Sequence, residues 1–186
     1  MIENARFVAR YLHKTRIFEY IIDLSRIYNM GVVAMNKFEV TKLGNPELFM
    51  ENRMTAHSDH VCYKNWEEAR ERYAVLPDVL GKKSSFRLFL DGTWKFHYAR
   101  NYEQTIPGFE QESYDCKSWG DIRVPAHIQM EGYDAPQYVN TQYPWDGREE
   151  IWTEEMPREF NPVASYVKYF TLPEYFMGER LFISFQ

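Results

Sequence analysis

The sequence predicts a mainly β fold, and three observations support this prediction. Aromatic residues make up 17% of the 186 residues, a content that suits sheets, in which rings pack across neighbouring strands. Apolar side chains alternate with polar ones from Thr93 to Tyr98, which is the two-residue period of a half-buried strand. A similar alternation returns at residues 166–171 and 181–186.

Residues 1–34 differ from the rest of the chain. Apolar residues recur there at roughly helical spacing, which predicts an amphipathic amino-terminal helix. These residues are Phe7, Val8, Tyr11, Leu12, Phe18, Ile21 and Ile22. Three interpretations stay open: the helix packs on its own domain, it lies on a membrane or a partner, or the extension does not belong to the mature protein. Met30 and Met35 are both available as later starts.

An irregular segment with one short helix is expected at residues 35–83. Gly44-Asn45-Pro46 marks a turn in its first part. Asn65 is suited to cap the amino terminus of the helix, because Glu68 follows three residues later as in a capping box. The helix should end before Pro77, and a linker is expected at residues 81–85.

The β domain is expected to occupy residues 84–186. Two runs with strand-like patterns, Phe86–Leu90 and Thr93–Tyr98, flank Asp91-Gly92, which predicts a hairpin with a tight turn. Three further short strands are expected at residues 121–124, 166–171 and 181–186. Because the chain stops inside the last of these strands, the hairpin partner of that strand would be missing. We therefore expect a domain that is incomplete at its carboxyl end.

Composition and charge disfavour several classes of function. The net charge of −5 and the lack of a long basic run argue against a nucleic-acid partner. No apolar run approaches the roughly 20 residues that cross a membrane, and no segment has the pattern of a signal peptide. The two cysteines, Cys62 and Cys116, form neither a disulfide framework nor a four-ligand zinc site. This cysteine usage favours the cytoplasm.

Several side chains suggest chemistry, but each has a plainer structural interpretation. Glu149-Glu150 and Glu154-Glu155 are acidic pairs, and a solvated acidic loop is favoured because adjacent side chains point apart. His57 and His60 lack third and fourth ligands nearby, so hydrogen bonds are favoured over a metal site. Cys116 has no histidine motif beside it, so we expect a packed or partly exposed thiol.

Three segments of the chain resemble motifs of one enzyme family, in the same order. Asn52–Asp59 is similar to an Asn-Arg-x-x-Ala-His segment, and Leu90–Phe96 is similar to a Leu-Asn-Gly-x-Trp-x-Phe strand pair. Val124–Pro144 agrees throughout with Val-Pro-x-x-x-Gln-x-x-Gly-Tyr-x-x-Pro-x-Tyr-x-Asn-x-x-Tyr-Pro. The family is that of the glycoside hydrolase family two β-galactosidases. The resemblance covers roughly residues 52–186.

The resemblance implies a fold and one site residue. It implies a jelly-roll β-sandwich, the galactose-binding-like sugar-binding domain of the family. It also implies that Asn140, the asparagine of the Tyr-x-Asn-x-x-Tyr-Pro motif, binds substrate, whereas the residue type alone favours a turn. The catalytic glutamates and the Mg²⁺ ligands of the family lie on a later barrel, so the resemblance implies no catalytic residue and no metal site in this chain. Near Asn140, Tyr143, Trp145 and Trp152 fit sugar stacking and loop pinning equally well.

The resemblance also implies an activity and partners. The parent enzyme would hydrolyse terminal β-D-galactosides such as lactose, with this chain joined to the remaining domains and possible assembly into a homo-oligomer. The chain alone should then be inactive. Two alternatives remain: a non-catalytic carbohydrate-binding module, and an assembly element that restores activity to a truncated partner, for which residues 36–63 are suited.

Overall fold

The computed structural model describes residues 3–12, 17–23, 45, 47–48, 55–58, 60–73, 84–135, 140, 145, 147, 149–152, 155–176 and 181–184. The chain divides into two compact units. The first comprises residues 1–51 and 91–177, and the second comprises residues 52–90 and 178–186. Expectations for Pro77, for residues 81–83 and for Tyr143 lie outside the described residues.

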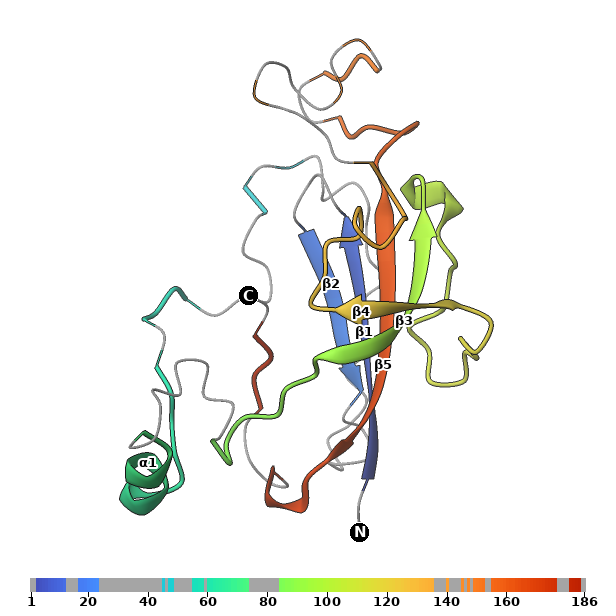
Figure 1. Ribbon diagram of the computed structural model, residues 1–186. Helices are drawn as coiled ribbons and strands as arrows, with labels where there is room; N and C mark the ends of the chain where they lie inside the picture. The colour runs from blue at the N-terminus through green and yellow to red at the C-terminus, as the bar shows by residue number, and fades with distance from the viewer. Residues whose placement is uncertain are drawn as a thin grey trace. The chain divides into compact units, whose positions relative to one another are not determined.

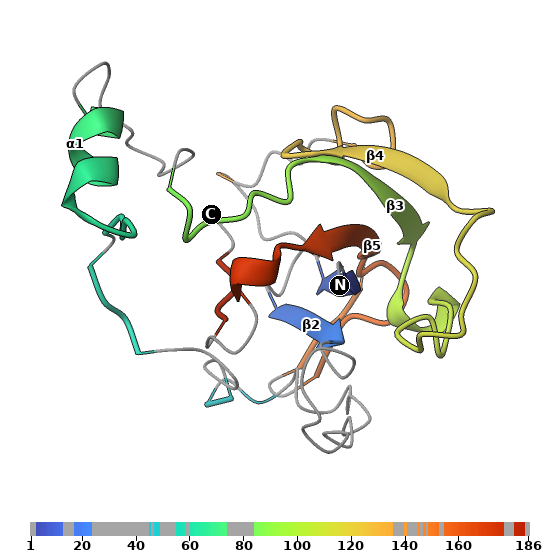
Figure 2. The same cartoon turned by 90° about the horizontal axis from the view of Figure 1, so that it is seen from below.

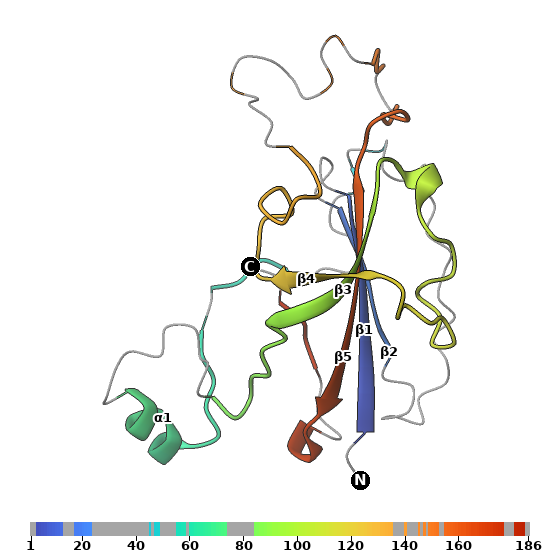
Figure 3. The same cartoon turned by 45° about the vertical axis from the view of Figure 1, so that its right-hand side comes forward.

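The first unit is built on an open antiparallel sheet, which confirms the mainly β prediction. Its five strands lie in the order β2-β1-β5-β3-β4. They are β1 (Glu3–Leu12), β2 (Ile17–Asp23), β3 (Gly92–Ala99), β4 (Gly120–Val124) and β5 (Val163–Leu172). The sheet twists strongly, so that β4 runs across the direction of β1 and β5 (Figures 1 and 3). Seen from below, β3 and β4 curve away from the other strands (Figure 2).

The prediction of a helix within residues 1–34 is wrong. Residues 3–12 and 17–23 are strands, and β1 lies between β2 and β5. All ten residues of β1 pair with β5, from Glu3 with Leu172 to Leu12 with Val163. Runs of aromatic and β-branched residues satisfy a helical spacing and a paired strand equally well. The hydrogen bonds that β1 forms with both β2 and β5 favour the strand over the helix for these residues.

Strand β3 packs against other residues on both of its faces, whereas the alternation from Thr93 to Tyr98 predicts a half-buried strand. On one face Phe96, 2% exposed, packs its ring 4.9 Å from the ring of Tyr166 on β5 and 4.4 Å from that of Tyr133. The opposite face is covered by a buried cluster, and this cluster is formed by Phe109, Cys116, Trp119 and Val167. Cys116 is therefore a packed thiol, as expected.

The prediction of a hairpin at Asp91-Gly92 is wrong for its first strand, residues 86–90. Gly92 takes a φ of +115°, a value that glycine tolerates, and β3 begins there. Residues 86–90, however, are irregular. Strand β3 pairs with β4 along residues 92–96 and with β5 along residues 95–99, so β4 and β5 are its partners in place of residues 86–90. The strand expected at 181–186 is likewise wrong for residues 181–184, which are irregular.

The short helix of the second unit is confirmed. Helix α1 spans Trp66–Tyr73, and the main-chain N–H of Glu68 donates to the Asn65 side chain at 2.8 Å. In return the Glu68 carboxylate accepts from the N–H of Lys64 at 2.6 Å, one residue before the position that a capping box uses. The carboxylate also accepts from Ser85, so this part of the expected linker is tied to the helix.

We predict that Phe96→Ala lowers the free energy of unfolding of the first unit by about 3–5 kcal/mol, because it leaves a cavity between two aromatic rings. Met130, 79% exposed, offers a control, and Met130→Ala should change stability by less than about 0.5 kcal/mol. Urea denaturation followed by tryptophan fluorescence measures both. Similar losses in the two variants would contradict the assignment of Phe96 to the core.

Candidate functional site

Asn140 is exposed and lies in a bend between two anchored aromatic residues. Before it in the chain, Tyr133 packs against Phe96, with its ring 6.4 Å from that of Tyr98. After it, Trp145 donates its indole N–H to the main-chain oxygen of Phe160 at 3.0 Å. The chain is therefore anchored to β3 at Tyr133, seven residues before Asn140, and to the residues before β5 at Trp145, five residues after it.

The bond of Trp145 bears on the two interpretations of the nearby rings. Because the indole N–H of this half-buried residue is used by Phe160, Trp145 pins the loop between residues 145 and 160. Trp152, in contrast, is 73% exposed. Of the three rings, Trp145 is thus the one for which the structure shows loop pinning.

Glu149 closes the same loop with its carboxylate. It accepts from the main-chain N–H of Arg158 at 2.6 Å and from that of Glu159 at 3.2 Å. Its own N–H donates to the main-chain oxygen of Trp145. Glu150 is exposed, as expected for a solvated acidic loop, whereas half-buried Glu149 is not simply solvated. The first acidic pair therefore contains one structural carboxylate, which sequence reasoning did not identify.

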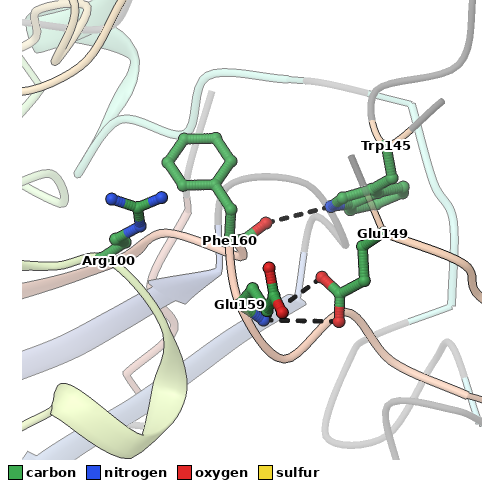
Figure 4. A pocket seen from close by; sticks show the side chains of 5 residues that line it. All are labelled: Arg100, Trp145, Glu149, Glu159 and Phe160. Carbon is green, nitrogen blue, oxygen red and sulfur yellow. Dashed lines mark hydrogen bonds between the residues drawn. The ribbon is translucent and has the colours of Figure 1, made fainter. Parts of the chain in front are cut away.

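A pocket of about 440 Å³ opens beside this clasp (Figure 4). Its described lining residues are Arg100, Trp145, Glu149, Glu159 and Phe160. The Arg100 guanidinium lies 5.5 Å from the centre of the Phe160 ring, as a cation–π pair does. Figure 4 shows Arg100 on the side opposite Trp145 and Glu149. Asn140 is not among the residues that line this pocket.

A buried amide lies next to the pocket in the chain. Asn161 is 1% exposed, and among the described residues neither its Nδ2 nor its Oδ1 has a hydrogen-bond partner. Its main-chain N–H donates to the main-chain oxygen of Arg100 at 3.1 Å. This bond links the residue that follows Phe160 to the residue that follows β3. Buried amides without partners are rare and costly in proteins, and this one marks the region as unusual.

Tyr98, at the end of β3, has a perturbed phenol. Burial and the nearby Asp134 carboxylate raise the pKa of Tyr98 to about 12, while the Arg100 guanidinium acts in the opposite direction. Asp134 belongs to the motif that leads to Asn140, and its Oδ2 is buried without a partner. The phenol is therefore a neutral hydrogen-bonding group at neutral pH.

The described residues do not fit a Mg²⁺ site. In the part of the chain that the structure describes, no group of three or more His, Cys, Asp or Glu side chains could hold a metal ion. The Nδ1 atoms of His57 and His60 both lie at hydrogen-bond distance from the main-chain oxygen of Ser58, at 3.0 and 3.2 Å. His57 thus has a structural hydrogen bond, as expected of it. Among the described residues, no helix is long and apolar enough to cross a membrane.

Glu149→Ala should open the carboxyl end of the loop. Hydrogen bonds to a charged group contribute about 1.5–3 kcal/mol, so the amide hydrogens of Arg158 and Glu159 should exchange roughly tenfold faster or more. Hydrogen exchange followed by NMR measures this effect, with Glu150→Ala as the matched control. If Glu150→Ala accelerated the same amides equally, the clasp would not depend on Glu149.

Tyr98 should make stability fall at high pH. Its folded-state pKa is raised from 10.0 to about 12, so the folded state favours the protonated phenol. The stabilisation is complete below pH 10 and is lost as the pH rises towards 12. Urea midpoints measured across this range should fall more steeply for the wild-type chain than for Tyr98→Phe. Parallel curves would contradict this assignment.

Comparisons with known proteins agree with the resemblance seen in the sequence. The profile described as "Glycosyl hydrolases family 2, sugar binding domain" matches residues 88–186. A protein named β-galactosidase from Halalkalibacterium halodurans is 48% identical over 147 residues, which cover 79% of this chain and 14% of that protein. Proteins of the same name from Streptococcus thermophilus and Clostridium acetobutylicum are 41% and 40% identical, over 78% and 81% of this chain and over 13% and 16% of their own lengths.

This chain therefore spans only about one seventh of the length of these relatives. A comparison with solved structures gave no significant match. The matched profile covers more than half of the chain and includes the whole of strands β3, β4 and β5. The chain belongs to family 2 of the glycosyl hydrolases and carries the sugar-binding domain of that family.

Proposed function

We propose that this chain is the amino-terminal part of a β-galactosidase that hydrolyses terminal β-D-galactosides, lactose among them, with retention of configuration. The observation that carries the proposal is the 48% identity to a protein named β-galactosidase over 79% of this chain. The sugar-binding domain profile over residues 88–186 supports the same assignment. A jelly-roll sandwich that begins near residue 84 and follows an irregular segment at 35–83 belongs to this proposal.

Asn140 is the proposed substrate-binding residue of this chain. A side-chain amide donates to one sugar hydroxyl and accepts from another. Two observations support this role: Asn140 is exposed, and the chain is anchored at Tyr133 before it and at Trp145 after it. Such restraint lowers the cost of ordering a binding residue when substrate arrives.

The catalytic carboxylates are proposed to lie outside this chain. A retaining glycosidase needs two carboxyl groups roughly 5–5.5 Å apart, one as nucleophile and one as acid/base. Glu149 is occupied by two main-chain N–H groups. Glu155, from the second acidic pair, accepts from the N–H of Trp152, and Glu154 lies outside the described residues. We propose that Mg²⁺, too, serves the full-length enzyme through residues beyond this chain.

Assembly and location are further parts of the proposal. The remaining domains of the enzyme would complete the active site, and the full-length enzyme would form a homo-oligomer. A cytoplasmic location is supported by the free thiols of Cys62, which is exposed, and Cys116, which is buried.

The experiment is a chimaera in which this chain replaces the matching segment of the Halalkalibacterium halodurans relative. We expect Asn140→Ala to lower kcat/KM for a chromogenic β-galactoside about ten- to hundredfold, because hydrogen bonds to the sugar are lost. Asn45→Ala, a change at another exposed asparagine, is the control and should leave kcat/KM unchanged. The free chain should show no turnover, with or without Mg²⁺.

An active free chain would contradict the proposal that the carboxylates lie elsewhere. A chimaera whose activity is indifferent to Asn140→Ala would remove Asn140 from the site while leaving the family unchanged. Saturable galactoside binding without any contribution to hydrolysis would instead favour the carbohydrate-binding module. Activity restored by simply mixing the free chain with an amino-terminally deleted relative would favour the assembly element.

A further inference from the structure

We propose that the pocket formed by Arg100, Trp145 and Glu159 is a second saccharide-binding site, separate from the site of Asn140. The pocket measures about 440 Å³, within the range of roughly 300–1,000 Å³ that small-molecule sites occupy. It lies at the end of β3, where the chain leaves the sheet at Arg100, and beside the hydrogen bonds that Trp145 and Glu149 make to residues 158–160. The proposal does not rest on the role given to Asn140.

The hydrogen-bonding capacity of the pocket is divided unevenly. The Glu149 carboxylate and the Trp145 indole N–H are already used by the main chain of residues 158–160. The Arg100 guanidinium contacts the face of the Phe160 ring, and this contact leaves its in-plane N–H groups available as donors. The Glu159 carboxylate points into the same pocket and can accept. Donors and an acceptor therefore face one space.

This combination selects a neutral ligand that carries hydroxyl groups. Two carboxylates disfavour an anion, and the guanidinium disfavours a cation. A sugar hydroxyl donates and accepts at once, so neighbouring hydroxyls of a pyranose can bond Arg100 and Glu159 together. The rings of Trp145 and Phe160 add apolar walls for the C–H groups of the sugar. A saccharide meets all of these conditions.

Asn161 supports the frame of the pocket, although it is not among the described residues that line it. Its main-chain N–H donates to the main-chain oxygen of Arg100 at 3.1 Å, and Phe160 precedes it in the chain. Arg100 and Phe160 are therefore held near one another before a ligand arrives, which lowers the cost of ordering them on binding.

The test is a titration of the whole chain with methyl β-D-galactopyranoside, followed by the indole N–H signals of its tryptophans in NMR spectra. The Trp145 signal, identified by its loss in Trp145→Phe, is expected to shift saturably. Arg100→Met and Glu159→Gln should each weaken binding about tenfold or more, because each removes a hydrogen bond to a charged group. Arg158→Met and Glu150→Gln are charge-matched controls outside the pocket and should bind as the wild type does.

Asn140→Ala separates this proposal from the proposed function, since the shift of the Trp145 signal should persist in that variant. A Trp145 signal that stays fixed while the Trp94 and Trp119 signals show a folded core would overturn the second site, as would equal losses in the control variants. Should the free chain give an undispersed spectrum, saturation-transfer NMR compares the chimaera carrying Asn140→Ala with and without Arg100→Met. Equal saturation transfer in those two proteins would also overturn the second site.

Discussion

The pairing of β5 with two neighbouring strands is the constraint on which the first unit depends. Strand β5 bonds to β1 along the whole of β1 and to β3 along the second half of β3. Val163 and Val167 on β5 are fully buried, so one strand carries hydrogen bonds at both edges and a core at its surface. The segment just before β5, at residues 158–161, receives the bonds that close the loop and shape the pocket.

The sequence predicted those elements best whose signal is local. Strand β4 and helix α1 were predicted close to their bounds, because alternation before a proline and a side-chain cap are read from a few neighbouring residues. Residues 1–34 were predicted wrongly as a helix, since runs of aromatic and branched residues fit two periods, and only the distant β5 decides between them. Residues 86–90 have the composition of a strand, but the partners of β3 are the distant strands β4 and β5.

The candidate site shows the same division. Asn140 came from a long motif that matched throughout, which no period or composition could have supplied. The role of Glu149 could not be predicted, because its partners are main-chain N–H groups nine and ten residues away, and main-chain groups leave no mark in a sequence. Trp145 stayed ambiguous until its partner at Phe160 was known. Arg100 and Glu159 carry no motif, and only the folded loop brings them to one pocket.

The clasp made by Glu149 has a consequence for how this region can diversify. The Glu149 carboxylate accepts hydrogen bonds from the main-chain N–H groups of residues 158 and 159 and not from their side chains. Substitutions at those two positions that keep the N–H group therefore keep these bonds. Glu159 faces the pocket, so substitutions there would alter its chemistry while its geometry is kept. Because the frame depends on main-chain atoms and the lining on side chains, single substitutions can change the chemistry of the pocket without changing its shape.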